Sequence, residues 1–400
     1  MKPLRVLVFS ASFGDGHFKA AEGLIQALKR TDSSIQIMHE DFMSIYNKML
    51  NSIIKNMYIK MIKRVPKLYG TFYQSTQNLP YDSRFQRFIN SLGHKRLMDY
   101  IYSLDPDIII CTYPTISGLL AELRTLNELR LPLVTVITDY SVHSQWIHPG
   151  VDLYIVGCTQ VRDGLIERGI NPQSIQVTGI PVSPKFDRLL SRKDTLYSLG
   201  LTTDRLTFLI MGGAYGVLGN AKWMCKLIAS ADAPVQAIFV CGKDRRLYHS
   251  LDSVLTEAKN PVVRFHYVNN IDELMSAADV IITKAGGLTV SEALTKHLPM
   301  VIFKPIPGQE ESNAHYIEEI GAGKIANNQQ EFLNIFNQLI QNENLISEMR
   351  DAAAREYPGN SAKRAVESIL GLAYKFRNVK PAVNSKATIN PTEGIVNPYI

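Results

Sequence analysis

The sequence predicts an α/β protein built from two parallel-sheet domains, each covered by helices. Short apolar runs bounded by turn residues alternate with amphipathic helical stretches from end to end, which is the pattern of strands joined by crossover helices. The 400 residues, of which 46% are hydrophobic, exceed what a single core usually holds. Near residue 180, two prolines and a glycine interrupt the alternation and mark a boundary between the halves.

The elements follow from the apolar runs in chain order. In the first half, strands are predicted at residues 4–10, 35–39, 107–111, 133–138, 153–156 and 174–178. In the second half, they are predicted at residues 206–211, 236–241, 262–267, 280–283 and 300–303. Intervening helices are predicted at residues 18–30, 115–126, 159–168, 221–230, 288–296, 312–320 and 330–341. We expect the loops after the strands to meet at one sheet edge, where open α/β sheets bind ligands.

The composition shifts divide the chain into four parts. We predict a first domain over residues 1–180, a linker over 181–204 and a second domain over 205–375, whose last helix can cross back to the first domain. The end of the chain, from 378 to 400, is rich in Pro, Asn and Thr without periodicity and is predicted to be a flexible tail.

Cysteine usage and hydropathy favour a protein that stays in the cytosol. The four cysteines are widely spaced, lie mostly in apolar runs and form no CxxC pair, which favours reduced core thiols over disulfides or a zinc site. No stretch approaches the roughly 20 apolar residues that span a bilayer, and the N-terminus leads straight into a strand rather than a signal peptide. The cysteines are Cys111, Cys158, Cys225 and Cys241.

Positive charge is concentrated between residues 48 and 96, where ten basic residues stand against the single acidic Asp82. Aromatic and apolar residues recur among these cations at helical intervals, which is typical of a surface that meets anionic lipid headgroups. A cationic solvated face that packs on the domain is the alternative, and nucleic acid is disfavoured because no motif for it accompanies the charge. The candidate docking residues are Lys55, Tyr58, Lys60, Lys63, Arg64, Lys67, Tyr69, Phe72 and Tyr73.

The first strand ends in a short glycine-containing turn that leads into a helix. Gly14 and Gly16 let the backbone approach a ligand, and a helix N-terminus favours negative charge. The full GxGxxG fingerprint is absent, which counts against a dinucleotide enzyme. His17 at the mouth of this turn is a candidate general base, with a helix cap or a turn-filling role as the alternative. Asp139, at the end of another strand, is a second catalytic candidate that orients His17 or faces the cleft itself, unless it only forms a turn.

Two further glycine turns follow strands of the second half. The first contains Gly212, Gly213, Tyr215 and Gly216, and the second contains Lys284, Gly286, Gly287 and Thr289. Both direct backbone amides toward a pyrophosphate, and the Thr289 hydroxyl can meet a phosphate oxygen or cap the helix. Glu292, three residues further on the same helix face, can accept from both ribose hydroxyls. The alternative interpretation of Thr289 and Glu292 is purely structural, because a capping box also has a glutamate three residues after a threonine.

A third polar turn, Pro305-Ile306-Pro307-Gly308-Gln309-Glu310-Glu311-Ser312-Asn313, again lies between a strand and a helix. A helix cap explains Ser312 alone. The cluster of Gln309, Glu310 and Asn313 suits the hydroxyl groups of a sugar better, because amides and carboxylates offer both donors and acceptors. Together, these turns indicate a ligand-binding site more specifically than any one of them does alone.

With these motifs in place, the chain resembles the monogalactosyldiacylglycerol-synthase-type glycosyltransferases, most closely the bacterial processive diacylglycerol glucosyltransferases. The resemblance covers roughly residues 4 to 375. The segments that carry it are GDGH at 14–17, GGAYG at 212–216, KAGGLTVSEAL at 284–294 and PGQEESN at 307–313, supported by DPDIII at 105–110, TDY at 138–140 and TGIP at 178–181.

The resemblance implies a GT-B fold, in which two Rossmann-like parallel-sheet domains face each other across a cleft. It implies His17 as the base and the glycine turns with Lys284 and Thr289 as pyrophosphate contacts. It further implies Tyr267 and Val268 as the uracil edge, Glu292 as the ribose ligand, and Gln309, Glu310 and Asn313 as glucose ligands. Ala285 departs from the family, whose members often have proline there, with little expected consequence because the glycines remain.

The activity implied by the resemblance is inverting, metal-independent transfer of glucose from UDP-glucose to diacylglycerol. The acceptor is held at the cytoplasmic face of the membrane, and a second sugar can follow, giving a glycolipid or a lipoteichoic acid anchor. UDP-glucose, diacylglycerol and anionic lipids are the expected partners, with no cofactor and no nucleic acid. Asp105-Pro106-Asp107 superficially fits a metal-binding DxD pair, but it precedes an apolar strand and indicates a turn.

Four alternatives stay open at this stage. They are galactosyl transfer to diacylglycerol, transfer of N-acetylglucosamine to an undecaprenyl-linked acceptor, epimerisation of a UDP-sugar, and a UDP-glucose sensor that binds a protein partner.

Overall fold

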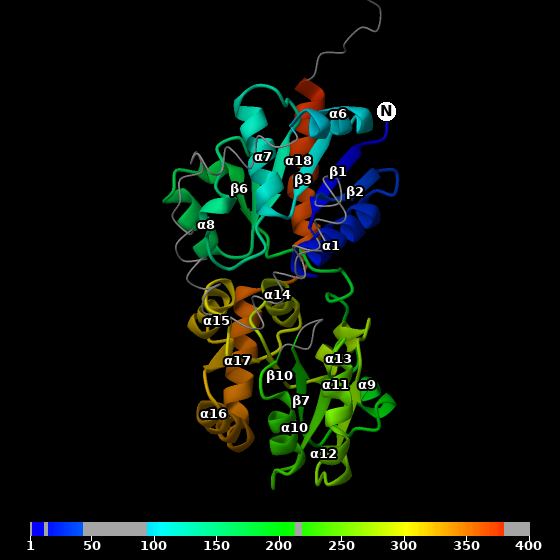
Figure 1. Ribbon diagram of the computed structural model, residues 1–400, viewed down its shortest axis with the longest axis vertical. Coiled ribbons are helices and arrows are strands. Elements are labelled where there is room, and N and C mark those ends of the chain that lie inside the picture. The colour runs from blue at the N-terminus through cyan, green and yellow to red at the C-terminus, as the bar shows by residue number, and fades with distance from the viewer. Residues whose placement is uncertain (1, 12–14, 43–93, 213–217, 380–400) are drawn as a thin grey trace, which may run out of the picture.

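The computed structural model describes residues 2–11, 15–42, 94–212 and 218–379. Figure 1 shows two lobes, one above the other, and each contains a parallel sheet with helices on both faces. The predicted fold class is confirmed, because helices alternate with parallel strands throughout the described chain.

The first sheet contains every strand that the sequence predicts in this half. Its strands are parallel and run in the order β2-β1-β3-β4-β5-β6. They are β1 (Arg5–Ser10), β2 (Gln36–Asp41), β3 (Ile108–Cys111), β4 (Leu133–Val136), β5 (Leu153–Val156) and β6 (Ile175–Val177). The central strands are buried along their whole length, as expected for a parallel sheet covered on both faces.

The second sheet is also parallel and has one strand more than the sequence indicates. Its order is β12-β11-β10-β7-β8-β9. Its strands are β7 (Leu206–Met211), β8 (Val235–Val240), β9 (Val262–Phe265), β10 (Val280–Thr283), β11 (Met300–Phe303) and β12 (Gly323–Ala326). The unpredicted β12 is an edge strand of four residues, GKIA, which is too short and too polar to produce a clear apolar run.

The helices that the sequence predicts are all present, and several more accompany them. The helices of the first half are α1 (Asp15–Thr31), α6 (His94–Leu104), α7 (Pro114–Thr125) and α8 (Thr159–Ile166). Those of the second half are α9 (Arg192–Ser198), α10 (Ala221–Ala229), α11 (Arg245–Ser250), α12 (Asp252–Thr256), α13 (Ile271–Ala277), α14 (Gly287–Thr295), α15 (Gln309–Glu319), α16 (Gln329–Gln341), α17 (Glu343–Glu356) and α18 (Ser361–Val379). Two short 3₁₀ turns, Ser144–Trp146 and Pro172–Ser174, complete the described elements.

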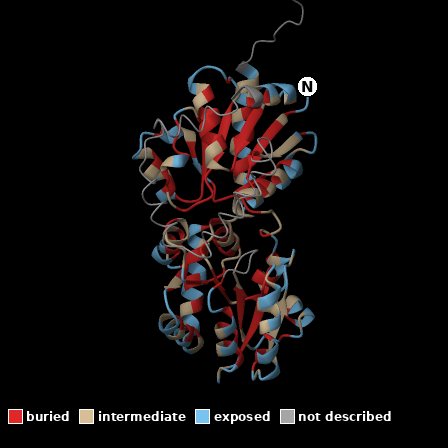
Figure 2. Cartoon of the chain, viewed as in Figure 1, coloured by how far each residue is buried: buried red, intermediate tan, exposed pale blue. Residues whose placement is uncertain are grey.

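The C-terminal helix α18 lies on the first sheet, although it follows the second domain in sequence (Figure 1). Its apolar face, including Val366 and Ile369, packs with Val6, Val8 and Leu24 in a single buried cluster. Figure 2 shows that buried residues fill both sheets and the helix faces against them. All four cysteines are buried and free, in agreement with the predicted core thiols.

The crossing between the lobes is held by contacts with the C-terminal part of the chain. Gly179 has a φ of +83°, and a side chain there would overlap the ring of Tyr357, so glycine is required. Tyr357 donates from its hydroxyl to the Ile180 carbonyl at 3.3 Å, and Arg364 donates to the Thr178 carbonyl at 2.6 Å. Helix α9 lies within the predicted linker of residues 181–204, whose boundaries stay a prediction.

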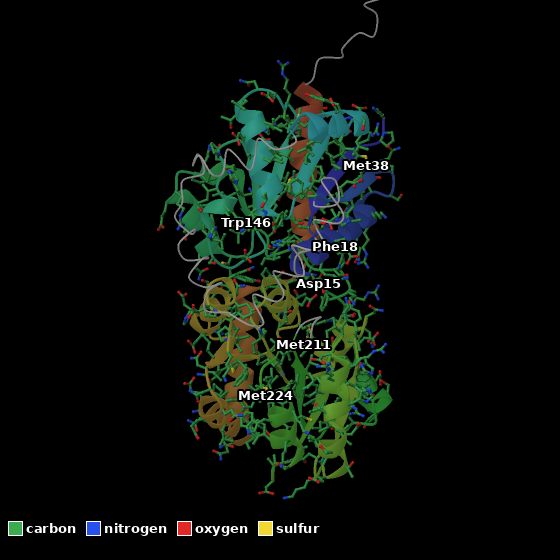
Figure 3. The ribbon with its side chains drawn as sticks, in the orientation of Figure 1. Asp15, Phe18, Met38, Trp146, Met211 and Met224 are labelled. Atoms are coloured by element: carbon green, nitrogen blue, oxygen red, sulfur yellow. The ribbon has the colours of Figure 1, made fainter. Side chains whose placement is uncertain are left out.

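The strand orders place one ligand-binding position on each sheet. Order reverses between β1 and β3 in the first sheet, and between β7 and β10 in the second. Ligands of open α/β sheets bind at such switch points, beyond the carboxyl ends of the strands. Figure 3 labels Asp15 and Phe18 at the edge of the first lobe that faces the second, and Met211 at the opposing edge of the second. No helix among those described is long and apolar enough to cross a membrane.

Candidate active site

His17 lies in the first turn of α1, the first helix after β1 in the described chain. Its Nδ1 forms a hydrogen bond of 2.9 Å with the Thr138 hydroxyl, and its carbonyl accepts a bond of 2.9 Å from the Thr112 hydroxyl. The imidazole lies edge-on to Tyr113, with ring centroids 5.2 Å apart, and 6.1 Å from Trp146. His17 is therefore held within the first domain rather than acting as a helix cap.

The surroundings of His17 favour its neutral form. Burial lowers the pKa of His17 to about 4, and a hydrogen bond with the Thr112 backbone offsets only part of this effect. Desolvation disfavours the charged imidazolium, so the ring is uncharged at neutral pH. A neutral imidazole is the form that accepts a proton.

The segment of Thr138, Asp139 and Tyr140 follows β4 and lies against the second domain. Asp139 accepts from Trp146 Nε1 at 3.3 Å and from Gln309 Nε2 in the second domain. Burial raises the pKa of Asp139 to about 6, while these two hydrogen bonds pull it down. The His17 ring bonds Thr138, one residue before Asp139, and the predicted role of Asp139 in orienting His17 or facing the cleft stays a prediction.

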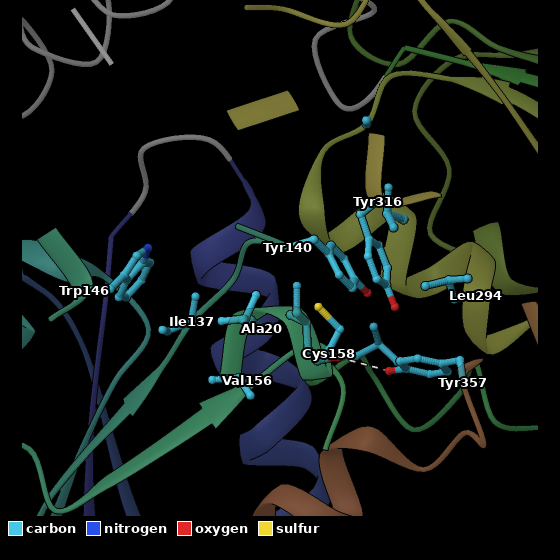
Figure 4. Packing of buried hydrophobic residues seen from close by; sticks show 14 of the residues in the cluster. Ala20, Ile137, Tyr140, Trp146, Val156, Cys158, Leu294, Tyr316 and Tyr357 are labelled. Atoms are coloured by element: carbon cyan, nitrogen blue, oxygen red, sulfur yellow. Dashed lines mark hydrogen bonds between the residues drawn. The ribbon is translucent and has the colours of Figure 1, made fainter. Parts of the chain in front are cut away.

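Tyr140 of the first domain lies beside Tyr316 of the second (Figure 4). Its amide donates to Asn313 Oδ1 at 2.9 Å, its hydroxyl bonds Ser291 Oγ at 2.8 Å, and its ring stacks on Tyr316 with centroids 4.6 Å apart. Asn313 also donates from Nδ2 to the Ala285 carbonyl at 2.9 Å and has no exposed surface. The predicted sugar ligand Asn313 is thus engaged on both sides by backbone groups, and it ties three chain segments together.

Gly287 lies directly against the backbone of the first domain. A β-carbon on this residue would lie 2.1 Å from the Thr138 carbonyl oxygen, which no side chain tolerates. Helix α14 begins here with Gly286 as its N-cap, so Thr289 lies inside the first turn. A capping box from Thr289 to Glu292 is therefore excluded, and both side chains are free of that structural explanation.

Lys284 and Glu310 come together from two different turns of the second domain. Lys284 Nζ lies 3.9 Å from Glu310 Oε2, and the same oxygen accepts from the Ile306 amide at 3.0 Å. Burial lowers the pKa of Lys284 and raises that of Glu310, and each partner opposes the shift of the other. Gly308, with a φ of +99°, turns the chain into α15 so that Gln309 and Glu310 face this point.

Glu292 lies one turn into α14, at a position where charges from both domains converge. Burial raises its pKa to about 8, against the opposing attraction of Lys185 in the predicted linker and Lys19 on α1. Lys185 is itself paired with Asp272 at 2.9 Å. Tyr267, beyond β9, is 45% exposed with Lys243 over its ring, and Val268 packs on the core. Helices α14 and α15, which carry Glu292 and Glu310, pack together.

The remaining predicted positions divide into placed residues and residues outside the described chain. Gly16 lies in the first turn of α1, Gly212 directly follows β7, and a β-carbon on Gly16 or Gly286 would have no atom of the described residues within 4 Å. Gly14, Gly213, Tyr215 and Gly216 lie outside the described residues, as do the nine candidate docking residues between Lys55 and Tyr73.

The DxD-like sequence lies far from this site. Asp105 pairs with Lys2 at 2.7 Å and Asp107 accepts from the Arg5 amide, both at the amino end of β3, in agreement with the predicted turn. The described ranges contain no cluster of three or more His, Cys, Asp or Glu side chains that could hold a metal ion.

Sequence reasoning missed Thr138, Tyr140 and Trp146 as site residues. The first two stand within the TDY motif that supports the family resemblance, so the signal was present but was assigned to Asp139 alone. Trp146 lies in an irregular segment whose partners, His17 and Asp139, no local pattern announces.

Comparison with known proteins decides between the families that share this architecture. The monogalactosyldiacylglycerol (MGDG) synthase profile matches residues 17–182, and the glycosyltransferase family 28 C-terminal domain matches residues 208–369. The chain is 31% identical over 366 residues to the processive diacylglycerol beta-glucosyltransferase of Bacillus pumilus, covering 92% of this chain and 94% of that protein. The chain belongs to the processive diacylglycerol beta-glucosyltransferase family.

Similar solved structures show the fold of the chain and nothing beyond the fold. MurG of Acinetobacter baumannii is 18% identical with a TM-score of 0.64, covering 92% of this chain and all of that one. A putative UDP-N-acetylglucosamine 2-epimerase from Listeria monocytogenes is 14% identical with a TM-score of 0.60, covering 94% of this chain and 98% of that one. Because proteins of different names share this GT-B-like architecture, family membership rests on the sequence relatives.

Proposed function

We propose that this chain transfers glucose from UDP-glucose to the hydroxyl group of diacylglycerol, inverting the anomeric centre, and then to the glucosyl-diacylglycerol product. The observation that carries the proposal is the 31% identity over 92% of the chain to an enzyme named for this transfer. The geometry supports it, because the neutral His17 of one domain bonds the same residue that contacts the start of α14 in the other.

His17 removes the proton of the acceptor hydroxyl as that oxygen attacks the anomeric carbon. Its ring is neutral in the donor-free protein because burial holds the pKa at about 4. A pKa this low makes a weak base, but the negative diphosphate of a bound donor raises the pKa toward neutrality. Proton transfer in the attack step then becomes favourable.

The departing UDP is stabilised by the second domain. The first-turn amides of α14 point out of the helix at Gly287, and the helix dipole adds partial positive charge there. Lys284 supplies a full positive charge beside them. We assign the neutralisation of the developing charge to these groups rather than to a metal ion. The proposal predicts that turnover survives an excess of EDTA, and loss of turnover that Mg²⁺ restores would contradict it.

The donor sugar and nucleoside lie along α14 and α15. We assign Glu310 and Gln309 to the glucose hydroxyls, Glu292 to the ribose, and Tyr267 with Val268 to the uracil edge. Gln309 donates to Asp139 of the first domain, so its amide lies at the boundary between the two domains. Asn313 keeps a role in holding the turn, because both ends of its amide are occupied by backbone groups.

The basic, aromatic segment between residues 48 and 96 is assigned to docking on anionic lipid at the cytoplasmic face of the membrane. Replacing Lys60, Lys63, Arg64 and Lys67 by serine should abolish cosedimentation with anionic vesicles and leave UDP affinity unchanged. Unaltered cosedimentation would reject the docking assignment while leaving the transfer reaction intact.

Incubation of the purified protein with vesicles that contain diacylglycerol tests the reaction itself. We expect UDP-glucose, and not UDP-galactose, to give a glucosylated lipid on thin-layer chromatography, followed by a slower-migrating product with two sugars. Product from UDP-N-acetylglucosamine with a lipid pyrophosphate acceptor, or conversion of the UDP-sugar without any lipid, would replace the proposal by the corresponding alternative. UDP binding with no product from any of these mixtures would indicate a sensor.

A further inference from the structure

We propose that Thr138 is the positioning residue of the catalytic base: its hydroxyl oxygen accepts from His17 Nδ1–H and thereby keeps the lone pair on Nε2, the nitrogen that receives the acceptor proton. The inference rests on the proposed function only in that it treats His17 as the base. It assigns a role to a residue that local sequence pattern did not single out.

The geometry leaves one useful tautomer. His17 Nδ1 and Thr138 Oγ1 lie 2.9 Å apart, so one of them must donate. If the threonine donated, the ring proton would stand on Nε2 and neither nitrogen could accept from a substrate. If Nδ1–H donates, Nε2 carries the lone pair that can receive a proton, and the same bond persists when the ring becomes imidazolium, because both nitrogens then carry protons. The hydroxyl of Thr138 thus serves the ring before and after proton transfer.

The neighbouring carboxylate is occupied elsewhere. Asp139 uses one oxygen to accept from Trp146 and the other to accept from Gln309. A neutral hydroxyl orients an imidazole without adding the negative charge that would raise its basicity. The low pKa of His17 is consistent with this kind of partner.

Thr138 itself is held in place by the second domain. Its side chain is 4% exposed, and its carbonyl oxygen lies against Gly287, where even a methyl group has no room. The next residues continue the attachment, through Asp139 to Gln309 and through Tyr140 to Asn313. The orientation of the base is consequently fixed at the same point where the donor half of the site meets the first domain.

The direct test observes the tautomer without any turnover. Protein labelled with ¹⁵N-histidine, with the His17 signals assigned by their loss in His17→Gln, should show at pH 7 a protonated Nδ1 and an unprotonated Nε2. A ring proton on Nε2 in the wild-type protein overturns the proposal. This measurement stands even if diacylglycerol proves to be the wrong acceptor, so it separates the inference from the proposed function.

Three variants test the consequence for catalysis with UDP-glucose and diacylglycerol vesicles. Thr138→Val keeps the shape of the side chain and loses the hydroxyl. It should lower kcat about tenfold or more, which is the scale of one lost hydrogen bond. The KM for UDP-glucose should change less than about threefold. Thr138→Ser should recover most of kcat because it restores the oxygen. Thr135→Val is the matched control: this buried threonine of β4 bonds Ser117, away from His17, and its loss should leave kcat within about threefold.

The outcomes with these variants either support or overturn the proposal. Equal losses in Thr138→Val and Thr135→Val, or no recovery in a folded Thr138→Ser, would show a structural role only and overturn the proposal. If Thr138→Val does not fold, the serine variant and the wild-type spectrum still decide.

Discussion

On the first domain, His17 and Asp139 lie in surroundings that suppress charge, whereas on the second domain Lys284 and Glu310 stand as an opposed pair at the mouths of two turns. Burial moves the pKa of His17 down to about 4 and that of Asp139 up to about 6, so each is pushed toward its neutral form. Lys284 and Glu310 lie 3.9 Å apart, and each opposes the effect of burial on the other. The first half of the site is suited to proton transfer and the second half to holding a charged donor.

This difference shows that the two lobes contribute different chemistry to a site that binds two substrates. A base must be neutral before reaction, so a desolvated pocket with a hydroxyl partner suits it. A diphosphate arrives with its charge, so the half that binds it needs amides, a helix start and a fixed cation. The two halves meet where Thr138 touches Gly287, and changes on either side of that contact separate their contributions.

The largest effect is expected on the side of the base. His17→Ala should lower turnover of UDP-glucose with diacylglycerol by about 10²–10⁴-fold, the usual contribution of a positioned base. UDP affinity, measured by calorimetry, should not change, because the diphosphate contacts belong to the other domain. His315→Ala, an exposed histidine on α15, is the control and should retain full turnover. Near-normal turnover of the His17 variant would remove this residue from the mechanism.

The next largest effect is expected at the contact itself. In Gly287→Ala, the new β-carbon would lie 2.1 Å from the Thr138 carbonyl, so the lobes must separate by roughly an ångström or more. A displacement of this size between base and donor costs about 10²-fold in turnover. The comparison is Gly286→Ala, whose β-carbon would have no atom of the described residues within 4 Å, and its loss should be clearly smaller. Equal losses in the two variants would indicate that both glycines act through the donor and not through the domain contact.

A smaller effect is expected from the side-chain bridge between the lobes. Asn313→Ala removes the bonds to the Tyr140 amide and the Ala285 carbonyl and leaves both groups buried. We expect turnover to fall about tenfold, with a lower melting temperature, because two buried backbone groups lose their partner. If Asn313 instead contacts glucose directly, KM for UDP-glucose should rise while the melting temperature stays constant.

The sequence predicted the strands of the first sheet, five strands of the second and the turns that build the site. These features are local: apolar runs of about four to six residues mark buried strands, and glycines mark turns where the backbone must approach a neighbour. The edge strand β12 was missed because GKIA carries no such run.

What could not be predicted depends on residues far apart in the chain. His17 and Thr138 are separated by 121 positions and meet through the packing of the first domain, whereas Tyr140 and Asn313 are separated by 173 positions and meet where the two lobes close; no local pattern announces either pairing. The sequence offered Asp139 as a residue that orients His17 or faces the cleft, and the contact of the ring with Thr138, one residue earlier, had no local signal.

The smallest effect is expected at Glu292, a carboxyl group of the second domain. Burial favours its neutral form, as it does for His17 and Asp139 of the first domain. Burial raises the pKa of Glu292 to about 8 from an ordinary value of 4.5, so folding takes up a proton between these two values and stability falls as the pH rises through that window. Glu292→Gln, which imitates the protonated acid, should melt at nearly the same temperature as the wild type near pH 5. At a pH of about 8.5 in the absence of donor it should melt higher by about 5 °C.

Calorimetric scans across this range measure the difference, with Glu318→Gln on the same domain as a control that should show no such trend. A constant difference at all pH values would mean that Glu292 is ionised in the folded protein. Glu292 would then be charged, like Lys284 and Glu310, and unlike the neutral groups of the first lobe. The contrast between the two lobes would hold without exception.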